Sequence, residues 1–240
     1  MNPTIFHLGI SAPPSLNTNI NINHTAVIDV IYNSNIDPLE ISEFMRVIPA
    51  LLILSQNGVR GLKRWMYYHK LDNKYFNKVK FWTVGDRTHA CLLKELNINS
   101  TFPKMMTGSG AVLMLQTSSV SNVLLISGAE LSDDFVSTLS VSGLNYFHFP
   151  VYKIQIIKNK SLMLTFENIS DNYIVFTSPS TVDGLLHTLA WSDLRALNAR
   201  CISIGPTTSQ CIRDYRGEIF IESKTPNVAN LYSQLSELIV

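Results

Sequence analysis

Short side chains with hydroxyl or amide groups follow two apolar segments of the chain at similar positions. Ser55 and Gln56 follow the segment 51–54, and the sequence Thr177-Ser178-Pro179-Ser180 follows the segment 174–176. In each case a second apolar segment comes later and ends in a Gly-x-x-Thr turn, at 85–88 and at 205–208. A helix that begins at such a turn offers free backbone N–H groups beside a hydroxyl, which suits a carboxylate or a phosphate. The pattern therefore predicts the binding of an anionic ligand.

Taken alone, each of these polar residues is best explained as an N-cap that stabilises the helix after it. Such a cap contributes about 1 kcal/mol. As a set, however, the residues are expected at one edge of a sheet, because ligands of open α/β sheets bind at the carboxyl ends of the strands. For the set, contact with a ligand is the favoured interpretation.

The two copies of this pattern have nearly the same spacing. Gly85 follows Ser55 by 30 residues, and Gly205 follows Ser178 by 27 residues. A repeated order of strand, polar turn, strand and Gly-x-x-Thr turn predicts two similar α/β domains. The chain has 240 residues, which is enough for two domains of ordinary size.

Apolar runs and helix-capping signals predict the remaining elements. Asp37, Pro38 and Glu40 begin a helix as N-cap, first residue and first-turn acid. Strands are expected at 5–10, 26–32, 51–54, 79–84, 123–126, 147–157, 174–176, 201–204 and 219–221, and the segment 11–23 is expected to be irregular. Further helices are expected at 59–68, 87–96, 106–115, 132–139, 180–189, 208–215 and 228–238. Strands that alternate with helices predict parallel, doubly wound sheets.

Composition and charge exclude several classes of protein. The net charge of +1 argues against a nucleic-acid-binding protein, and an apolar content of 46% argues against a disordered chain. The segment 105–129 has no charged residue, yet its many Ser, Thr, Asn and Gln residues argue against a membrane span. The N-terminus lacks the pattern of a signal peptide. We therefore expect a soluble, cytoplasmic protein with no membrane partner.

Other residue types that carry chemistry lack a supporting pattern. The six histidines have no metal-site spacing, and the three cysteines form neither a disulfide framework nor a zinc pattern, so no metal is expected. The aromatic residues Trp65, Tyr67 and Tyr68 share one predicted helix and are expected to pack in a core.

An ordered set of segments resembles the uroporphyrinogen-III synthase family over roughly residues 50–240. No single segment is specific, and the resemblance rests on the set. The segments are Leu54-Ser55-Gln56-Asn57-Gly58-Val59, Val84-Gly85-Asp86-Arg87-Thr88, Val123-Leu124-Leu125-Ile126-Ser127-Gly128 with the later Val151-Tyr152, Phe176-Thr177-Ser178-Pro179-Ser180, Ile204-Gly205-Pro206-Thr207-Thr208 and Thr225-Pro226-Asn227.

The resemblance implies an architecture of two flavodoxin-like domains that are joined by a two-stranded β-ladder, with the active site in the cleft between them. Transferred to this chain, it implies a discontinuous first domain of residues 1–23 and 151–240, and an inserted second domain of residues 24–150. Two departures affect the expected site. The family's Thr-Arg-Pro sequence after the first strand is replaced here by Gly9-Ile10-Ser11-Ala12-Pro13, and an arginine that is common in the family is replaced by Ser127.

The resemblance also implies a reaction. The family's substrate is hydroxymethylbilane, a linear tetrapyrrole with many carboxylates, which loses water and closes to uroporphyrinogen III through a spiro intermediate that inverts the terminal ring. No cofactor is implied; the enzyme must fold a flexible substrate into one geometry. The candidate substrate-binding residues are Ser55, Gln56, Thr88, Thr177, Ser178, Ser180, Thr207 and Thr208.

Tyr152 is the candidate catalytic residue. It matches the tyrosine of the family's Val-Tyr segment, which can hydrogen-bond the departing hydroxyl group of the substrate, and a phenol can donate such a bond at neutral pH. A tyrosine that packs between the domains is an equally good interpretation. The protein is expected to act as a monomer, with a transient contact to the upstream bilane-forming enzyme as a further expectation.

The main alternative is a two-domain protein that binds an anionic small molecule as a sensor or regulatory subunit, without turnover. The altered segment after the first strand motivates this alternative. A nucleotide enzyme of the Rossmann type is a weaker alternative, because no G-x-G-x-x-G sequence follows the first strand.

Overall fold

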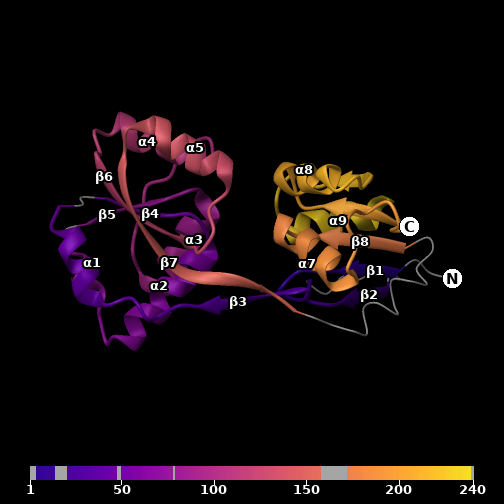
Figure 1. The fold of residues 1–240 in the computed structure, drawn as a ribbon, viewed down its shortest axis with the longest axis horizontal. Coiled ribbons are helices and arrows are strands. Elements are labelled where there is room, and N and C mark those ends of the chain that lie inside the picture. The colour runs from indigo at the N-terminus through magenta and orange to yellow at the C-terminus, as the bar shows by residue number, and fades with distance from the viewer. Residues whose placement is uncertain (1–3, 14–20, 48–49, 78, 158–171, 239–240) are drawn as a thin grey trace. The chain divides into compact units, whose positions relative to one another are not determined.

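The computed structural model describes residues 4–13, 21–47, 50–77, 79–157 and 172–238. These residues form two compact units, which we call the discontinuous unit (Met1–Asp29 with Gln155–Val240) and the inserted unit (Val30–Ile154). Figure 1 shows both, with the inserted unit in purple to pink. No helix in the described part of the chain combines the length and apolar character needed to cross a membrane.

The inserted unit is a five-stranded sheet with helices on both faces. The strand order is β3 (Ile28–Tyr32), β7 (Asn145–Ile156), β6 (Asn122–Gly128), β4 (Ala50–Ile53) and β5 (Lys80–Thr83). Strands β4–β7 are parallel. Helices α1 (Pro38–Met45), α2 (Gln56–Tyr68) and α3 (Asp86–Leu96) pack on one face, and α4 (Gly108–Thr117) and α5 (Asp133–Ser142) pack on the other. A short helix, η1 (Asn73–Phe76), precedes β5.

Strand β4 is buried on both faces, as its run of apolar residues predicts. Leu51 and Ile53 pack against α2 and α3, while Ala50 and Leu52 pack against α4 and α5. Because successive side chains of a strand point to opposite faces, a strand with layers on both sides must be apolar throughout. This interior strand, which lies between β6 and β5, holds the N-terminus of α2 at the carboxyl edge of the sheet.

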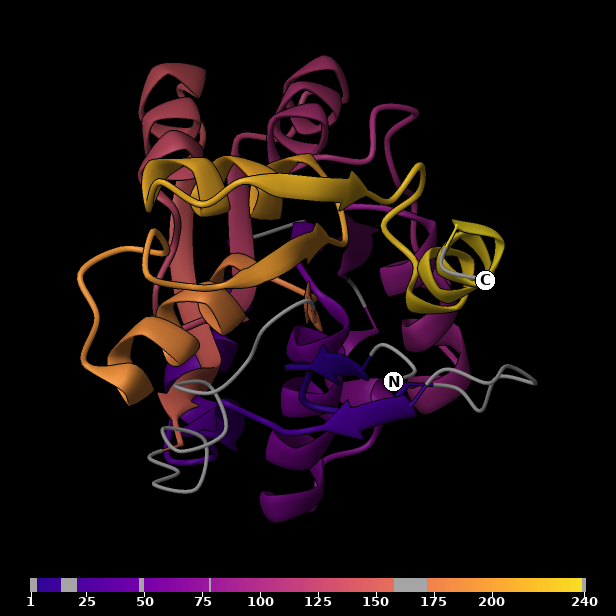
Figure 2. The ribbon, with the colours of Figure 1, turned by 90° about the vertical axis from the view of Figure 1, so that its right-hand side faces the viewer.

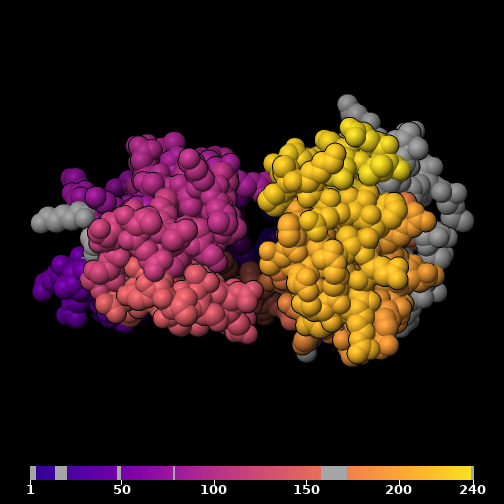
Figure 3. Space-filling view, turned by 90° about the horizontal axis from the view of Figure 1, so that it is seen from above, coloured from indigo at the N-terminus to yellow at the C-terminus, as the bar shows by residue number. Residues whose placement is uncertain are grey.

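The discontinuous unit combines strands from both ends of the chain. Its strand order is β10 (Ile219–Glu222), β9 (Ala199–Ser203), β8 (Asn172–Phe176), β1 (Thr4–His7) and β2 (Asn21–His24), all of them parallel. Figure 2 shows the indigo strands β1 and β2 in one sheet with the orange and yellow strands. Helices α7 (Pro179–Leu189) and α8 (Pro206–Asp214) cover one face, and α9 (Val228–Leu238) covers the other. In the space-filling view the C-terminal part of this unit, from β8 to α9, forms a packed body in orange and yellow (Figure 3).

The prediction of doubly wound, parallel α/β sheets is confirmed, and so is the pairing of two strands, β3 and the long β7, where the chain passes from one unit to the other. The N–H of Asn33 donates to the carbonyl of Val151, and that of Ile157 donates to the carbonyl of Val27, both at 2.9 Å. This pattern makes β3 antiparallel to β7.

One expected irregular segment was assigned wrongly. Residues 21–24 form strand β2, whereas the sequence predicted no regular structure from 11 to 23; residues 14–20 of that segment lie outside the described residues. The sequence Asn-Ile-Asn-His has little apolar character because β2 is an edge strand, and Asn21, Asn23 and His24 are exposed. Backbone pairing with β1 and the packing of its one apolar residue, Ile22, against the core hold this strand in place.

Candidate functional site

The hydroxyl groups of Ser55 and Tyr152 lie 3.1 Å apart at the carboxyl edge of the inserted unit's sheet. Ser55 follows β4 and is the N-cap of α2, where its Oγ accepts the N–H of Gly58 at 3.0 Å. A serine oxygen can accept one hydrogen bond and still donate its own proton. The capping role and the contact with Tyr152 are therefore compatible, and the cap fixes the position of the serine hydroxyl.

A β-bulge directs Tyr152 to this position. In the pairing of β6 with β7, Ser127 lies opposite Pro150 but Gly128 lies opposite Tyr152, so Val151 is an extra residue. Val151 is fully buried, and Tyr152 packs against the same apolar cluster although it is the next residue. Bulges change the direction of side chains in this way. Gly128 leaves room for the phenol ring, since a Cβ atom there would lie 3.1 Å from it.

A pocket of about 330 Å³ lies beside Tyr152. Its lining comes from β3 and the residues after it, from the end of β6 and from β7, and includes Asn33, Asn35, Ala129, Tyr152 and Lys153. The ammonium group of Lys153 and the amides of the two asparagines can bind a carboxylate, while the Tyr152 hydroxyl can donate to a leaving group. A pocket that combines apolar residues with a few polar groups, and that two phenols line, those of Tyr32 and Tyr152, therefore adjoins the sheet edge.

Ser127, buried near the end of β6, forms a polar pair with the half-buried His148 of β7. The Ser127 hydroxyl donates to the carbonyl of Gly128 at 3.0 Å and lies 2.8 Å from His148 Nε2. His148 Nε2 also lies 3.0 Å from the Gly128 carbonyl. Burial lowers the pKa of His148, and its bond to Gly128 opposes this. A neutral pair thus occupies the place where the family resemblance implied an arginine.

The two Gly-x-x-Thr turns have the same local structure. Each strand ends in a fully buried hydroxyl residue that donates to the glycine carbonyl two residues later: Thr83 to Gly85 at 3.3 Å, and Ser203 to Gly205 at 2.8 Å. The glycines are the N-caps of α3 and α8, and they have no side chain that could accept a first-turn N–H group. Such helix N-termini can bind an anion.

The two helix N-termini differ in charge. In α3 the first residue is Asp86, whose exposed carboxylate accepts the N–H of Arg87 at 2.6 Å. In α8 the corresponding residue is Pro206, and no acidic residue lies in the first turn. A carboxylate at a helix N-terminus competes with an external anion for the same positive potential. The N-terminus of α8 is therefore the more favourable of the two for an anionic ligand.

The predicted substrate-binding residues divide into accessible and buried ones. Those that are partly or fully accessible are Ser55, Gln56, Thr177, Ser178, Ser180 and Thr207. Thr88 and Thr208 are only 5% and 2% exposed. The structure brings Ser55 and Gln56 together with Tyr152 at one sheet edge, and places Thr177, Ser178, Ser180 and Thr207 at the carboxyl ends of β8 and β9 in the discontinuous unit.

A histidine pair at the carboxyl end of β1 was not indicated by any pattern in the sequence. His7 is 1% exposed, and its Nδ1 lies 2.9 Å from the Tyr232 hydroxyl. Burial and the nearby His24 lower the pKa of His7 to about 4, against an opposing bond to the backbone of Ser11. His24 Nε2 donates to the carbonyl of Gly9 at 2.8 Å. These contacts hold the turn after β1, where the resemblance implied a different sequence.

Lys153, Asn33 and Asn35 are further functional candidates that the sequence analysis did not select. All three line the pocket beside Tyr152. The position of Lys153 directly after Tyr152 was visible in the sequence. The asparagines approach only through the pairing of β3 with β7, in which Asn33 Nδ2 donates to the Pro150 carbonyl at 3.3 Å.

Comparison with known proteins gives a match to one family model and one curated relative. The model described as "Uroporphyrinogen-III synthase HemD" matches residues 28–233. The porphyrin biosynthesis protein HemD of Ruminiclostridium josui is 28% identical over 193 residues, which cover 78% of this chain and 38% of that protein. The matched region thus spans well under half the length of this relative.

Solved structures of similar fold include two uroporphyrinogen-III synthases. The enzyme of Helicobacter pylori 26695 superposes with a TM-score of 0.68 at 18% identity, over 99% of this chain and all of that chain. A mutant of the enzyme of Thermus thermophilus gives a TM-score of 0.63 at 14% identity, over 98% of both chains. At these identities the likeness concerns the fold.

Proposed function

The chain belongs to the uroporphyrinogen-III synthase family, since the family model covers most of its length, and from this we propose that it converts hydroxymethylbilane to uroporphyrinogen III. In class the enzyme is a cyclising hydro-lyase of tetrapyrrole biosynthesis. The observation that carries the proposal is the Tyr152 hydroxyl, which lies 3.1 Å from the Ser55 hydroxyl and beside a pocket of about 330 Å³.

Binding of the substrate is proposed to rest on neutral donors at the carboxyl edges of the two sheets. The net charge of the chain is +1, so a broad basic surface does not account for the binding of a polycarboxylate. Backbone N–H groups at the N-termini of α2, α3, α7 and α8, and the hydroxyls of Thr177, Ser178, Ser180 and Thr207, are suitable donors. The buried Thr88 and Thr208 are proposed to act by shaping their turns rather than by presenting a hydroxyl.

Tyr152 is proposed to assist the loss of water from the substrate. In this step the bond between the terminal methylene carbon and the hydroxyl oxygen breaks, the oxygen leaves as water with an added proton, and the pyrrole nitrogen supplies the electron pair and then loses its proton. The phenol donates a hydrogen bond to the leaving oxygen, while its own oxygen is supported by the Ser55 hydroxyl. Lys153 and the asparagines of the pocket are proposed to hold a nearby carboxylate.

The subsequent ring closure needs positioning more than acid–base chemistry. The substituted carbon of the far pyrrole ring attacks the electrophilic methylene carbon, and the spiro intermediate then reopens and closes with that ring inverted. Restricting a flexible chain to one reactive conformer can supply several kcal/mol of the barrier reduction. We also propose a cytoplasmic monomer that receives its unstable substrate by a transient contact with the enzyme that produces it.

Isomer analysis of the product tests this function. Hydroxymethylbilane is made freshly by its upstream enzyme, this protein is added, and the uroporphyrin isomers are separated after oxidation. The expected product is mostly type III, whereas the reaction without protein gives type I. Type I alone from folded protein would contradict the proposal and favour a binding protein without turnover, which a binding titration with the bilane would then detect.

A further inference from the structure

A second pocket, of about 630 Å³, lies along α2 in the inserted unit. Its lining includes Arg60, Lys63, Arg64, Tyr67 and Tyr68 of α2. This volume falls within the usual range of about 300–1,000 Å³ for small-molecule sites. The helix begins at the sheet edge that carries Tyr152, but these residues lie from its second turn to its end.

The lining is positively charged. In the part of the chain that the structure describes, Arg60, Lys63 and Arg64 face one carboxylate, that of Glu95. Lys63 forms an ion pair with Glu95 at 2.7 Å, so these two charges largely offset each other. Arg60 donates to a neutral acceptor, the side-chain oxygen of Asn57, at 3.2 Å. Two guanidinium groups therefore give the pocket its excess charge, and guanidinium groups bind phosphates and carboxylates in a bidentate manner.

Aromatic rings at the rim of this pocket are exposed. The sequence predicted that Trp65, Tyr67 and Tyr68 all pack in a core, but only Trp65 does. Tyr67 is 86% exposed and Tyr68 is 66% exposed. The helix turns Trp65 and Met66 toward the sheet, so the next two residues must point away from it. Two adjacent exposed tyrosines beside two arginines offer stacking and charge at the same place.

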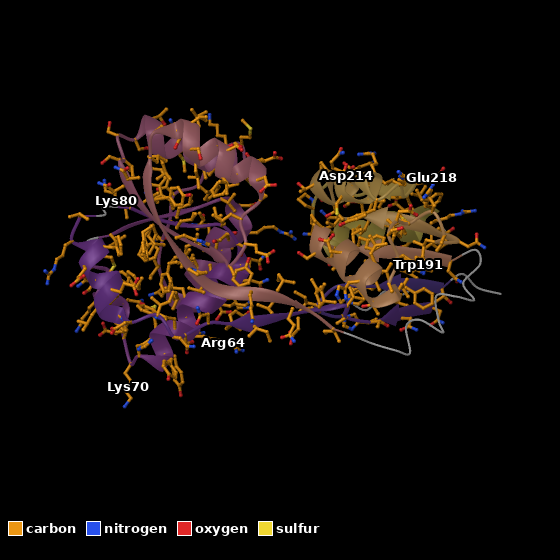
Figure 4. All side chains as sticks on the ribbon, viewed as in Figure 1. Arg64, Lys70, Lys80, Trp191, Asp214 and Glu218 are labelled. Atoms are coloured by element: carbon orange, nitrogen blue, oxygen red, sulfur yellow. The ribbon has the colours of Figure 1, made fainter. Side chains whose placement is uncertain are left out.

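The wall of the pocket is held in place by three contacts that join α2 and its C-cap residue, His69, to the segment that begins in β3. The guanidinium of Arg64, labelled in Figure 4, lies over the Tyr32 ring at 4.3 Å. His69 Nε2 donates to the carbonyl of Ser34, and Trp65 Nε1 donates to that of Ile36, both at 2.8 Å. A preformed wall lowers the entropic cost of binding.

We propose that this pocket binds a planar aromatic molecule that carries two or more negative charges. The ring stacks against Tyr67 or Tyr68, and the anionic groups bind Arg60 and Arg64. A nucleotide and an aromatic polycarboxylate share this chemistry. The inference does not depend on the proposed function: of the described residues that line this pocket, only Tyr32 also lines the one beside Tyr152.

Calorimetric titration with four probes separates the contributions of charge and ring. ADP has both features with phosphate as the anion, and mellitate has both with carboxylates. Adenosine has the ring without the charge, and pyrophosphate has the charge without the ring. We expect ADP or mellitate to bind more tightly than about 1 mM, and each of the other two to bind at least about fivefold more weakly than the better of these. The comparison of ADP with mellitate identifies the preferred anion.

Substitutions of the lining residues test whether the ligand binds in this pocket. Arg60→Gln and Arg64→Gln are each expected to weaken binding by about tenfold, and Tyr67→Ala by about fivefold. Glu95→Gln removes the competing carboxylate and frees Lys63, so it is expected to strengthen binding, a result that a damaged fold would not produce. Lys74→Gln, which removes an exposed cation of η1 outside the lining, is the matched control and leaves binding unchanged.

Three results would overturn the proposal. The first is that neither ADP nor mellitate shows saturable binding, and the second is that ADP is the better ligand but pyrophosphate binds as tightly as ADP. The third is that Lys74→Gln loses as much affinity as the arginine variants. The rate of type III formation by Arg60→Gln and Tyr67→Ala, measured in parallel, is expected to stay at the wild-type value. An absence of ligand binding at this pocket and an absence of type III formation are thus separate outcomes.

Discussion

The hydroxyls of Tyr152 and Ser55 are 3.1 Å apart, although 97 positions separate the two residues in the sequence. The β-bulge between β6 and β7 positions Tyr152, and the N-cap of α2 positions Ser55. Neither local structure depends on the other for its formation. The contact therefore places a supported phenol at the sheet edge at little cost to the fold.

Replacement of Tyr152 by phenylalanine tests its role. The variant retains the ring that packs against the apolar cluster but cannot donate to the leaving oxygen. Rates of type III formation are expected to fall by about 100-fold, with an unfolding free energy within about 1 kcal/mol of the wild type. Single-turnover kinetics measure the rate of type III formation, and urea unfolding measures the free energy of unfolding. A wild-type rate in this variant would assign Tyr152 a packing role only.

Replacement of Ser55 by alanine separates support of the phenol from capping. Loss of the cap on α2 is expected to reduce stability by about 1 kcal/mol. The rate is expected to fall less than in Tyr152→Phe, since the phenol itself remains. Thr107→Ala, which removes the equivalent cap of α4, is the matched control for stability. A similar loss of rate in both capping variants would mean that the contact with Tyr152 has no part in the reaction.

Asp86 is expected to oppose substrate binding at the N-terminus of α3. Asp86→Ala removes a carboxylate that accepts the N–H of Arg87, so this N–H becomes available to a substrate carboxylate. KM is expected to fall about two- to fivefold, in line with the size of helix-dipole effects. Glu40→Ala is the control. Glu40 also lies in the first turn of a helix, but α1 follows β3, which runs antiparallel to the other strands of its sheet, so the N-terminus of α1 lies at the opposite edge of the sheet from that of α3. Steady-state kinetics at low ionic strength measure both, and a raised KM in Asp86→Ala contradicts the prediction.

Stability should fall in mild acid because of His7. Its pKa is about 4 in the folded state and about 6.5 in the unfolded state, so between these values the unfolded chain binds more protons. The stabilisation is complete above about pH 6.5 and is lost as the pH falls toward about 4. It amounts to at most about 3–4 kcal/mol, since one pKa unit corresponds to about 1.4 kcal/mol. His7→Gln should show a weaker pH dependence of the urea midpoint than the wild type.

The control for that measurement is Tyr232→Phe. It removes the hydroxyl that contacts His7 Nδ1 but leaves the histidine and its burial in place, so the acid sensitivity should persist. His148, whose pKa burial also lowers, contributes in the same direction to the wild type and to both variants. Equal pH profiles in His7→Gln and the wild type would exclude His7 as the cause.

Gly61 is required by the close approach of α2 to β7. A Cβ atom there would lie 2.6 Å from Val151 Cγ2 and 2.8 Å from the Val151 carbonyl oxygen. Although alanine favours a helix, Gly61→Ala is expected to destabilise by about 1–3 kcal/mol through overpacking. Gly205→Ala, whose Cβ would meet only Pro226 at 3.6 Å, should cost at most about 1 kcal/mol, the preference of an N-cap for glycine over alanine. Denaturant unfolding compares the two.

Local patterns of the sequence predicted those elements whose formation depends on neighbouring residues. The Gly-x-x-Thr turns, the buried strand β4 and the start of α1 at Asp37 follow from periodicity and capping. Strand β2 was missed because an exposed edge strand needs no apolar pattern, and its pairing with β1 is not visible locally.

Contacts over long distances explain what the sequence could not predict about the site. The bulge that directs Tyr152 depends on pairing of β7 with β6, and the contact of His7 with Tyr232 joins residues 225 positions apart. The exposure of Tyr67 and Tyr68 depends on which face of α2 meets the sheet. Aromatic residues at successive positions cannot all face inward on a helix, so the pattern alone could have argued against one shared core.

The discontinuous unit has a consequence for synthesis on the ribosome. Strand β1 pairs with β8, and the hydrogen bond from Thr4 to Asn172 joins residues 168 positions apart. At about 5–20 residues per second, the first strands wait roughly 8–34 seconds for this partner, while the inserted unit is already complete. During that time β2 can pair with one edge of β1, but the other edge of this strand, Thr4–His7, has no partner, and such an exposed edge is the kind of segment that chaperones bind and that aggregates when translation outpaces folding.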